Sequence, residues 1–521
     1  MADMVLRPAR AVPTTLAAVA ERCGAHAPAG SDDVVLTGAS VDSRDVRPGD
    51  LFGAFPGFTV HGARFGADAA ASGASAFLTD AEGEALLRDA GVEGPVLVVA
   101  DARAAMGEAA AQIYGDPSRD LTFVGVTGTN GKTTTSYLIE NALARVHEHT
   151  GIMGTVELRI GDEAMESPRT TVESPVLHGL LARMREDGVT AAVTEVSSHA
   201  ATLERIAGVE FAVAVFTNLQ WDHLDFHGTM ENYLDAKAKL FAPGRAHIGI
   251  INVDDEWGRT LAARVEIPAQ TVSTHVDDPH PADWTVVQAD IGLDGVGSRF
   301  VFTDPEGSEH QAFSPLPGLV NVSNSMVAIA AAVAAGVPIV EAIEGVATAH
   351  GVPGRMERVI ERSDVDPLAI VDYAHTPDAL TLALEGVRPI TPGRLILIFG
   401  SDGDRDQGKR PVMGEIAARL ADVIVLTDEN PRSEDPAAVR AAIRAGIEKE
   451  RPGLADVHEV EPRVLAVETA LRLARPDDTV IVTGKGHEPT QEIAGVFHRY
   501  NDRDAYLQAH ARMVAEREDQ A

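Results

Sequence analysis

Cysteine is almost absent from this chain of 521 residues, as are long apolar runs. Cys23 is the single cysteine, which excludes an intramolecular disulfide and favours a reducing compartment. No apolar run approaches the ~20 residues that a membrane-spanning helix needs, and the first residues lack the apolar stretch of a signal peptide. We therefore expect a cytoplasmic protein that does not insert into a membrane.

Positive charge is also scarce. Lysine and arginine together number 44 against 78 acidic residues, for a formal net charge of −34. Such a surface repels nucleic acid and anionic membranes, so partners bound by neutralising phosphates are not expected. An anionic small substrate would need a local basic pocket to offset the negative electrostatic field of this surface.

Lysine is rarer than arginine, since only six of the 44 basic residues are lysines. Two of them, Lys237 and Lys239, stand in "NYLDAKAKLF" (232–241), while Lys132 and Lys485 lie in glycine-containing stretches. Because the composition strongly favours arginine, we interpret the retained lysines as residues that their positions require.

The length predicts roughly three domains at about 100–200 residues each. Short strand-like and alanine-rich helical stretches fill residues 1–117, which end at the proline- and charge-bearing joint "YGDPSRD". We expect an α/β protein with a smaller N-terminal α/β domain (1–117), a central domain (118–352) and a C-terminal domain (353–521).

The two larger domains show the pattern of parallel sheets. From residue 121, helices separate the fully apolar strands "LTFVGVTG", "AAVTEVS", "FAVAVFTN" and "HIGIINVD". Continuously apolar strands are typical of sheets covered on both faces, so the central domain is predicted to be doubly wound. The strands "LAIVDYA", "RLILIFG", "DVIVLTD" and "DTVIVTG" predict a Rossmann-like C-terminal domain. Alternating residues at 284–308 predict a hairpin insert.

The first central strand runs into a glycine-rich loop, "TGTNGKTT" (127–134). The generic phosphate-loop pattern would place a glycine at the position of Val126, so only its core, "GTNGKTT", is met. Its glycines let backbone N–H groups approach phosphate oxygens at the start of a helix. Lys132 would reach the β- and γ-phosphates and the Thr133 hydroxyl would hold Mg²⁺. The predicted ATP-binding residues of the loop are Gly128, Thr129, Asn130, Gly131, Lys132, Thr133 and Thr134.

This loop is similar to the signature of the Mur ligase family, whose spacing also differs from the generic pattern. Eight further stretches resemble the family in the same order. They are "TEVSSHA" (194–200), "TNLQWDHLDFHGTMENYLDAK" (217–237), "GLVNVSNSMVAIAAA" (318–332), "VPGRMERV" (352–359), "DYAHTPDAL" (372–380), "GDRDQGKRP" (403–411), "DENPRSEDP" (428–436) and "TGKGHE" (483–488). The resemblance covers nearly the whole chain and points to the members that add the third residue of the peptidoglycan stem peptide.

The resemblance implies a reaction. ATP phosphorylates the γ-carboxylate of D-glutamate in UDP-N-acetylmuramoyl-L-alanyl-D-glutamate, the amine of a diamino acid attacks the acyl phosphate, and ADP and phosphate leave. Positioning and electrostatic stabilisation of the crowded phosphates would supply most of the catalysis. A monomer is expected.

The resemblance also implies a metal centre. Mg²⁺ prefers oxygen ligands, and Thr133 and Glu195 match the family's first metal site. His223 matches a ligand of a second metal, and Lys237 matches a lysine that reacts with CO₂ to form a carbamate. Carbamylation needs a neutral amine, which a buried lysine can supply and an arginine cannot. Catalytic roles follow for Lys132, Lys237 and His223, whereas Lys239 is interpreted as a solvated side chain.

Substrate and nucleotide contacts are carried over in the same way. For the UDP-substrate they are Ser43, Thr170, Thr171, Ser197 and Arg205, with Arg44 and His61 as weaker neighbours of Ser43. For the nucleotide they are Asn324, Arg355, Asp372 and His375, with Asn321 beside them. The chain departs from the family at Arg169, where asparagine is common, and at Leu203, where glutamine is common.

The C-terminal domain is expected to select the diamino acid. The matching residues are Arg405, Glu429, Asn430, Pro431, Arg432, Gly484 and Glu488. Arg432 could hold the extra carboxylate of meso-2,6-diaminopimelate bidentately, or could pair with Glu434 on the surface. Diaminopimelate-adding members usually carry aspartate at the position of Glu429, so L-lysine, L-ornithine and diaminobutyrate stay open beside the favoured diaminopimelate.

Two other functions are considered. A folylpolyglutamate-synthetase-like or cyanophycin-type ligase is disfavoured by the N-terminal "DSR…PGDLF" segment and the "ENPR" loop. A P-loop switch ATPase would hydrolyse ATP without an amino acid acceptor, whereas a ligase would release phosphate only with both co-substrates present.

Overall fold

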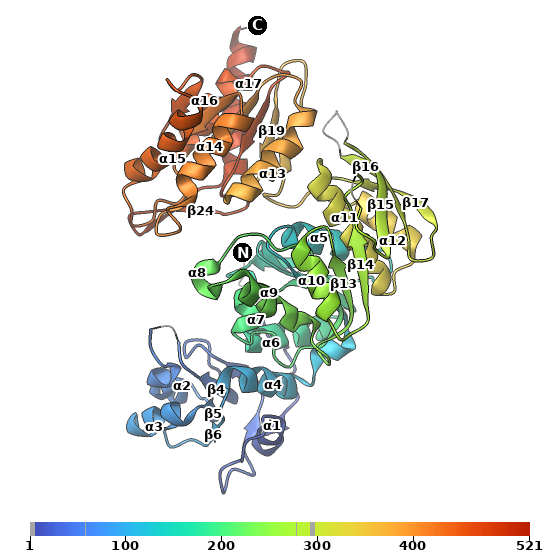
Figure 1. Ribbon diagram of the computed structural model, residues 1–521. Helices are drawn as coiled ribbons and strands as arrows, with labels where there is room; N and C mark the ends of the chain where they lie inside the picture. The colour runs from blue at the N-terminus through green and yellow to red at the C-terminus, as the bar shows by residue number, and fades with distance from the viewer. Residues whose placement is uncertain (1–5, 58, 278, 292–296, 521) are drawn as a thin grey trace. The chain divides into compact units, whose positions relative to one another are not determined.

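The computed structural model describes residues 6–57, 59–277, 279–291 and 297–520. The chain forms two compact units. Figure 1 labels the helices and strands and colours them by residue number. The first comprises residues 1–273, 280–284 and 327–345, and the second comprises residues 274–279, 285–326 and 346–521. Within the described residues no helix is long and apolar enough to cross a membrane.

The N-terminal part of the first unit is a small parallel sheet with helices. Its strand order is β3-β4-β5-β6, formed by Gly38–Ser40, Asp50–Ala54, Ala76–Thr79 and Val96–Val98. The short strands β1 (Thr14–Thr15) and β2 (Val35–Leu36) pair separately, and the helices are α1 (Leu16–Arg22), α2 (Gly66–Ala71), α3 (Ala81–Asp89) and α4 (Ala102–Tyr114). The last helix ends where Gly115 adopts the left-handed conformation, φ +70°, so the predicted joint is a helix C-cap.

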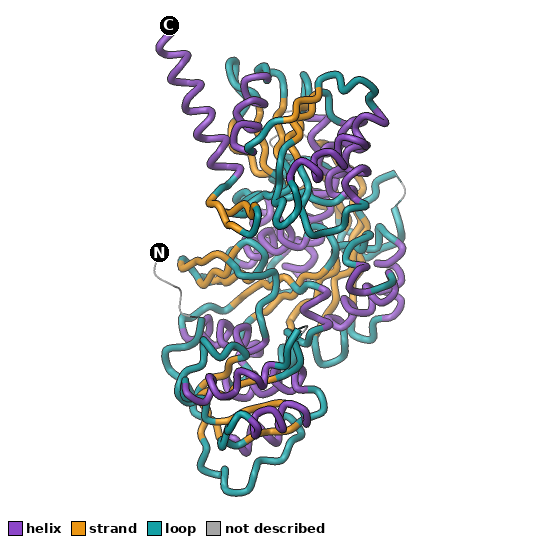
Figure 2. The backbone as a smooth tube through the Cα atoms, turned by 90° about the vertical axis from the view of Figure 1, so that its left-hand side faces the viewer, coloured by secondary structure: helices purple, strands orange, loops and turns teal. Residues whose placement is uncertain are grey.

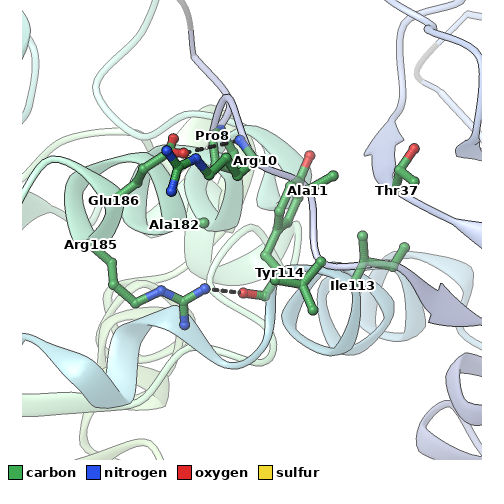
Figure 3. A pocket seen from close by; sticks show the side chains of 10 residues that line it. Pro8, Arg10, Ala11, Thr37, Ile113, Tyr114, Ala182, Arg185 and Glu186 are labelled. Carbon is green, nitrogen blue, oxygen red and sulfur yellow. Dashed lines mark hydrogen bonds between the residues drawn. The ribbon is translucent and has the colours of Figure 1, made fainter.

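The first described residues pack against helix α6 (Ser174–Glu186) beside this joint. The backbone N–H groups of Ala9 and Arg10 donate to the Glu186 carboxylate at 2.6 and 3.0 Å. Arg185 donates to the carbonyl of Tyr114 at 2.9 Å, and Arg10, Tyr114, Arg185 and Glu186 line a cavity (Figure 3). Helix α6 thus holds both the N-terminal segment and the end of α4.

The central part of the first unit is a largely parallel sheet with the order β10-β9-β8-β11-β7-β12-β13-β14. Its strands are β7 (Thr122–Thr127), β8 (Thr150–Met153), β9 (Glu157–Ile160), β10 (Glu163–Glu166), β11 (Ala191–Glu195), β12 (Phe211–Phe216), β13 (Ala246–Asn252) and β14 (Ala269–Ser273). Helices α5 (Lys132–Leu143), α6, α7 (Ser198–Thr202), α8 (Leu224–His227), α9 (Met230–Ala238) and α10 (Glu256–Arg264) connect them. The α/β prediction is confirmed.

The register of this sheet decides which residues share an edge. Glu195, the last residue of β11, pairs with Val126 of β7, and Phe216, the last residue of β12, pairs with Thr127. Because these strands are parallel, their carboxyl ends meet at one edge, where such sheets bind ligands. The phosphate loop starts from the middle strand of the three.

The second unit contains three antiparallel strands and a six-stranded sheet. Strands β15 (Trp284–Ile291) and β16 (Ser298–Thr303) pair as the predicted hairpin, although residues 292–296 of that prediction lie outside the described residues. β17 (Glu309–Ser314) adds a third strand that the sequence analysis did not predict. Helices α11 (Leu319–Ala334) and α12 (Ile339–Ala347) follow along the chain, and their residues 327–345 belong to the first unit.

The six-stranded sheet has the order β18-β19-β23-β20-β21-β22, and β18 alone is antiparallel to its neighbour. Its strands are Glu357–Ile360, Leu368–Val371, Thr479–Val482, Leu395–Phe399, Val423–Leu426 and Val457–Glu459. On one face lie α13 (Pro377–Val387), α14 (Lys409–Leu420) and α15 (Pro436–Glu450), and on the other lie α16 (Arg463–Leu473) and α17 (Asp502–Gln520). The last helix, α17, projects from the unit at its C-terminal end (Figure 2).

A buried histidine on α6 makes the stability of the first unit depend on pH. His178 is fully buried, its Nε2 lies 3.0 Å from the carbonyl of Ala207, and burial lowers its pKa to about 4. The unfolded chain binds a proton near pH 6.5, so stability is fully present above that pH and is lost as the pH falls toward 4. We expect the loss to reach at most about 3 kcal/mol.

Denaturant unfolding at pH 7.5 and pH 5 should therefore show a smaller difference for His178→Gln than for the wild type. The glutamine amide can keep the hydrogen bond to Ala207 but takes up no proton. An equal pH dependence of the two proteins would contradict this role of His178.

Candidate active site

The phosphate loop is shaped by glycine at its two turning points. Gly128 has φ +151°, and a Cβ there would lie 1.9 Å from Oγ1 of Thr217. Gly131, with φ +84°, directly precedes helix α5. Lys132 folds back over the loop, where its Nζ donates to the carbonyls of Gly128 and Thr129 at 3.0 and 2.8 Å. The helix N-terminus and this ammonium group together form a site suited to phosphate.

The end of strand β12 supports the loop. The Asn218 side chain accepts from the Asn130 N–H at 3.0 Å, and Thr217 donates to the Asn130 carbonyl at 2.7 Å. Gln220 accepts from the Asn130 amide at 2.6 Å, and its N–H donates to Thr129 Oγ1 at 3.0 Å. Sequence reasoning missed these roles, although polar residues directly after a strand beside the phosphate loop were a usable signal.

The predicted first metal ligands lie together. The hydroxyl of Thr133 donates to both carboxylate oxygens of Glu195 at 3.0 Å, and both residues are buried. Thr155 donates to the same carboxylate from its backbone N–H (2.7 Å) and its hydroxyl (3.0 Å). A hydroxyl and a carboxylate facing each other at the phosphate loop are a donor set that suits Mg²⁺, so the residues fit the ion.

These two residues would not hold an ion unaided. Among the described residues no three His, Cys, Asp or Glu side chains are grouped so as to hold a metal. Phosphate oxygens and water would have to complete a magnesium sphere here.

Lys237 of helix α9 reaches the same loop from the other side. Its side chain is 2% exposed, and Nζ donates to the Gly128 carbonyl at 2.6 Å. Nζ also lies 4.6 Å from the ring centroid of Tyr233, whose hydroxyl is 3.2 Å from Thr129 Oγ1. Burial, followed by the charge of Lys132, lowers the pKa of Lys237 well below its ordinary value. The neutral amine that carbamylation requires is therefore favoured.

The second lysine of this stretch, just after helix α9, behaves differently. Lys239 is 46% exposed and pairs with Glu204 at 2.6 Å. The prediction of a solvated side chain is confirmed.

His223 lies at the edge of this cluster. It has φ +53°, pairs with Asp222 at 3.3 Å, and its ring centroid is 6.2 Å from that of Tyr233. Burial lowers its pKa to about 4, against the opposing effect of Asp222. The imidazole is therefore neutral near pH 7, the form that binds metals. Tyr233 contacts both predicted second-site residues and was itself missed.

Four residues predicted for the UDP-substrate lie beside Glu195. Thr171 Oγ1 donates to the Glu195 carbonyl at 2.8 Å and accepts from the Ser197 N–H at 3.1 Å. The hydroxyl oxygens of Thr170 and Thr155 are 3.1 Å apart. Arg205 donates to the Thr171 carbonyl at 3.1 Å. The structure thus brings Thr170, Thr171, Ser197 and Arg205 together.

The two departures from the family lie near this group. Arg169 and Arg205 both pair with Glu173, at 2.6 and 2.9 Å. Arg169 thus adds a second cation to one carboxylate. Leu203 is the C-cap residue of helix α7.

The N-terminal candidates form a separate group. Ser43 is half-buried in a turn, and the residues on either side of it, Asp42 and Arg44, form an ion pair at 2.5 Å. His61 caps a short helix by accepting from the Ala63 N–H at 3.0 Å, and lies 3.2 Å from Asp80. Local contacts therefore explain the positions of the Arg44 and His61 side chains.

The nucleotide candidates Asn324, Arg355, Asp372 and His375 belong to the second unit. Asn324 donates to Asn321 at 3.1 Å near the start of α11. The other three lie near the end of β19. Arg355 stacks 4.0 Å from the ring centroid of Tyr373, and buried Asp372 accepts from the N–H groups of Met356 and Ala374 at 2.8 Å. His375 Nδ1 is 2.8 Å from the Tyr373 carbonyl.

Most amino-acid candidates form one network around the loop 428–432. The Asn430 amide donates to Glu488 at 3.0 Å, and buried Lys485 donates to both residues at 3.0 and 2.8 Å. Burial, together with the Asp402 carboxylate, raises the pKa of Glu429 to about 8. Gly484 lies against Glu429, since a Cβ there would be 2.5 Å from its carboxylate. Lys485 and Asp402 were missed as members of this network.

Arg432 and its neighbours complete this group. Arg432 lies 3.5 Å from Asp402, whereas Glu434 pairs with Arg410 at 2.8 Å. The alternative pairing of Arg432 with Glu434 is therefore wrong. Pro431 is buried in the loop, and Arg405 is exposed.

Three family models match the chain. The model described as Mur ligase family, catalytic domain, matches residues 35–114, the Mur ligase middle domain matches 126–332, and the Mur ligase, glutamate ligase domain matches 354–486. A UDP-N-acetylmuramoyl-L-alanyl-D-glutamate–2,6-diaminopimelate ligase from Streptomyces coelicolor is 47% identical over 507 residues, which are 96% of this chain and 97% of the relative. A UDP-N-acetylmuramyl-tripeptide synthetase from Leifsonia xyli is 42% identical over 508 residues, with 96% and 97% covered.

Solved structures agree with this match. A structure of a UDP-N-acetylmuramoyl-L-alanyl-D-glutamate–2,6-diaminopimelate ligase superposes with a TM-score of 0.68 at 32% identity, covering 96% of this chain and 99% of that one. MurF ligase from Thermotoga maritima in complex with ADP has a TM-score of 0.61 at 17% identity, covering 92% and 98%, and shows the fold alone.

Proposed function

The chain belongs to the Mur ligase family, and on that premise we propose that it is an ATP-dependent ligase that joins a diamino acid to UDP-N-acetylmuramoyl-L-alanyl-D-glutamate in peptidoglycan synthesis. The favoured diamino acid is meso-2,6-diaminopimelate. The observation that carries the proposal is the buried amine of Lys237, which donates to the phosphate loop at Gly128 over 2.6 Å. A buried, neutral amine beside a phosphate site suits the carbamate chemistry of acyl-phosphate-forming ligases better than simple ATP hydrolysis.

In the first half of the reaction, the phosphate loop would hold the triphosphate of ATP. Lys132 would exchange its contacts with the Gly128 and Thr129 carbonyls for phosphate oxygens. Thr133 and Glu195 would hold Mg²⁺, which supplies charge neutralisation between the phosphates. A γ-carboxylate oxygen of the D-glutamyl residue then forms a bond to the γ-phosphorus, and the bond to ADP breaks.

In the second half, the amine of the diamino acid forms a bond to the acyl carbon. The amine loses a proton, and the phosphate leaves with the bonding electron pair. Carbamylated Lys237 would present one negative charge shared by two oxygens where an ammonium would repel Mg²⁺, and neutral His223 would be a further ligand. The proposed roles of Thr170, Thr171, Ser197 and Arg205 are contacts to the muramoyl-dipeptide.

The choice of diamino acid depends on the second unit. Arg432 carries a guanidinium that could bind the additional carboxylate of diaminopimelate in a fork-like contact. Glu429 is buried with Oε2 lacking a hydrogen-bond partner among the described residues, and it stands where aspartate is usual. Its extra methylene changes the pocket by about one bond length, so L-lysine, L-ornithine and diaminobutyrate are the alternative acceptors.

Further parts of the proposal concern organisation. We propose that residues 1–117 bind the UDP part of the substrate, 118–352 bind ATP and 353–521 bind the diamino acid. A cytoplasmic monomer is part of the same proposal.

The decisive experiment incubates the protein with ATP, Mg²⁺, UDP-N-acetylmuramoyl-L-alanyl-D-glutamate and one diamino acid at a time. Mass spectrometry is expected to show the diaminopimelate tripeptide, with sustained phosphate release only when both co-substrates are present. A product with another diamino acid and none with diaminopimelate would replace the favoured acceptor. Sustained phosphate release without any acceptor would instead support a switch ATPase.

A further inference from the structure

The loop 428–432 of the second unit is backed by a small hairpin outside the main sheet. The hairpin consists of β24 (Thr490–Ile493) and β25 (Val496–Arg499), which form a separate two-stranded sheet. Strand β24 lies alongside the loop, and its backbone pairs with Arg432 in a parallel bridge at Ile493. The residues expected to bind the diamino acid therefore rest on a second layer of chain.

Hydrogen bonds join the two segments along their length. The N–H of Arg432 donates to the Glu492 carbonyl at 3.0 Å, and the Ala494 N–H donates to the Arg432 carbonyl at 2.7 Å. The Glu492 N–H donates to the Asn430 side chain at 3.2 Å. The two bonds to the Arg432 backbone hold a non-glycine residue at φ +54°, a conformation that needs support from its surroundings.

One side chain of the hairpin reaches under the start of the loop. Gln491 is 6% exposed, and its Nε2 donates to the carbonyls of Glu429 at 2.8 Å and Asp428 at 3.3 Å. These two carbonyls lie at the start of the loop whose side chains form the predicted amino-acid site. A buried carbonyl needs a donor, so Gln491 satisfies the loop at the point where its backbone must turn.

We propose that Gln491 is a positioning residue for the incoming diamino acid, because it fixes the loop that carries Glu429, Asn430 and Arg432. The inference rests on the proposed function, since it assigns the loop to the binding of a diamino acid. Gln491 does not touch that ligand; it acts through the backbone of residues 428–432. Its loss removes the amide donor from the Glu429 carbonyl and leaves the Asp428 carbonyl with the Arg463 guanidinium at 3.3 Å, which frees the loop to leave the conformation that binds.

The test compares kinetic constants of Gln491→Leu with those of the wild type. Leucine preserves size and burial but removes the amide donor, so KM for the accepted diamino acid should rise about tenfold. The values of kcat and of KM for ATP and for the UDP-substrate should stay within about twofold. Gln491→Glu, which turns a carboxylate oxygen toward the two carbonyls, should raise the same KM at least as much. Gln508→Leu, the same change on the exposed face of α17, is the control.

An unchanged KM for the diamino acid in folded Gln491→Leu would overturn the inference. So would a parallel rise of all three KM values with a lowered melting temperature, because that result shows general damage to the unit. Product formation by the wild type tests the proposed function separately, and only the ratio of variant to wild type tests Gln491.

A measurement on the wild type keeps the inference testable if the variants do not fold. Hydrogen–deuterium exchange is followed with and without the diamino acid that the wild type accepts. The amides of Arg432 and Ala494, which carry the bridge, should slow together by at least about fivefold when the loop is held by ligand. Slower exchange in 428–432 with no change in 490–494 would overturn the proposed coupling.

Discussion

Replacing Lys237 with arginine is expected to abolish ligase activity, with a loss of at least about 10³-fold in kcat. A guanidinium stays charged at neutral pH and cannot form a carbamate, whereas the buried amine of Lys237 has a strongly lowered pKa. The substitution also keeps a cation next to Lys132 and the phosphate loop, where an anion is proposed. Added bicarbonate should not restore activity. Product formation and coupled phosphate release measure the effect.

The matched control for this experiment is Lys239→Arg. Lys239 stands two residues further on, directly after helix α9, and forms a half-exposed pair with Glu204, which an arginine can keep. The activity of Lys239→Arg should stay within about twofold of that of the wild type, because a surface ion pair contributes little to stability. Full activity of Lys237→Arg would refute the proposed carbamate. A circular dichroism spectrum equal to that of the wild type would show that the inactive variant is folded.

Glu195→Gln is expected to lower kcat by about 10²-fold and to raise the Mg²⁺ concentration required for half-maximal activity by at least about tenfold. The carboxylate is 1% exposed and accepts from Thr133 and Thr155. A glutamine amide keeps the shape of the side chain and one acceptor oxygen, but it removes the negative charge that Mg²⁺ needs. The measurement is the Mg²⁺ dependence of product formation at saturating ATP.

Glu140→Gln controls for the loss of a buried carboxylate in the same unit. Glu140 lies on helix α5, is 5% exposed and pairs with Arg159 at 3.0 Å, away from the Thr133 hydroxyl. Its replacement should lower the melting temperature while the Mg²⁺ requirement stays the same. If Glu195→Gln and Glu140→Gln shifted the Mg²⁺ dependence equally, Glu195 would not be a metal ligand.

Local patterns predicted much of the fold. Four strands of each large sheet were expected at the right places, because a run of apolar residues bounded by glycine and polar turns needs no distant information. They are β7, β11, β12 and β13 in one sheet and β19, β20, β21 and β23 in the other, whereas β8, β9, β10, β14, β18 and β22 were not predicted. The hairpin at 284–308 was predicted, but β17 was not, because "EHQAFS" lacks a strong alternating pattern. The pairing of Arg432 was also misjudged, since the sequence offered the nearby Glu434 and gave no sign of Asp402.

By itself, the sequence determined the class of the protein and the phosphate loop, and it identified Lys237 as the candidate for the proposed carbamate, because these depend on residue type and short spacing. Only the tertiary structure decided that Lys237 is buried against Gly128, that Thr133 meets Glu195, and that Gln491 supports the loop at Glu429. These contacts join residues 109, 62 and 62 positions apart. Strand order brings these distant residues together, and burial then changes the chemistry of their side chains. Neither can be read from the position of a residue in the sequence.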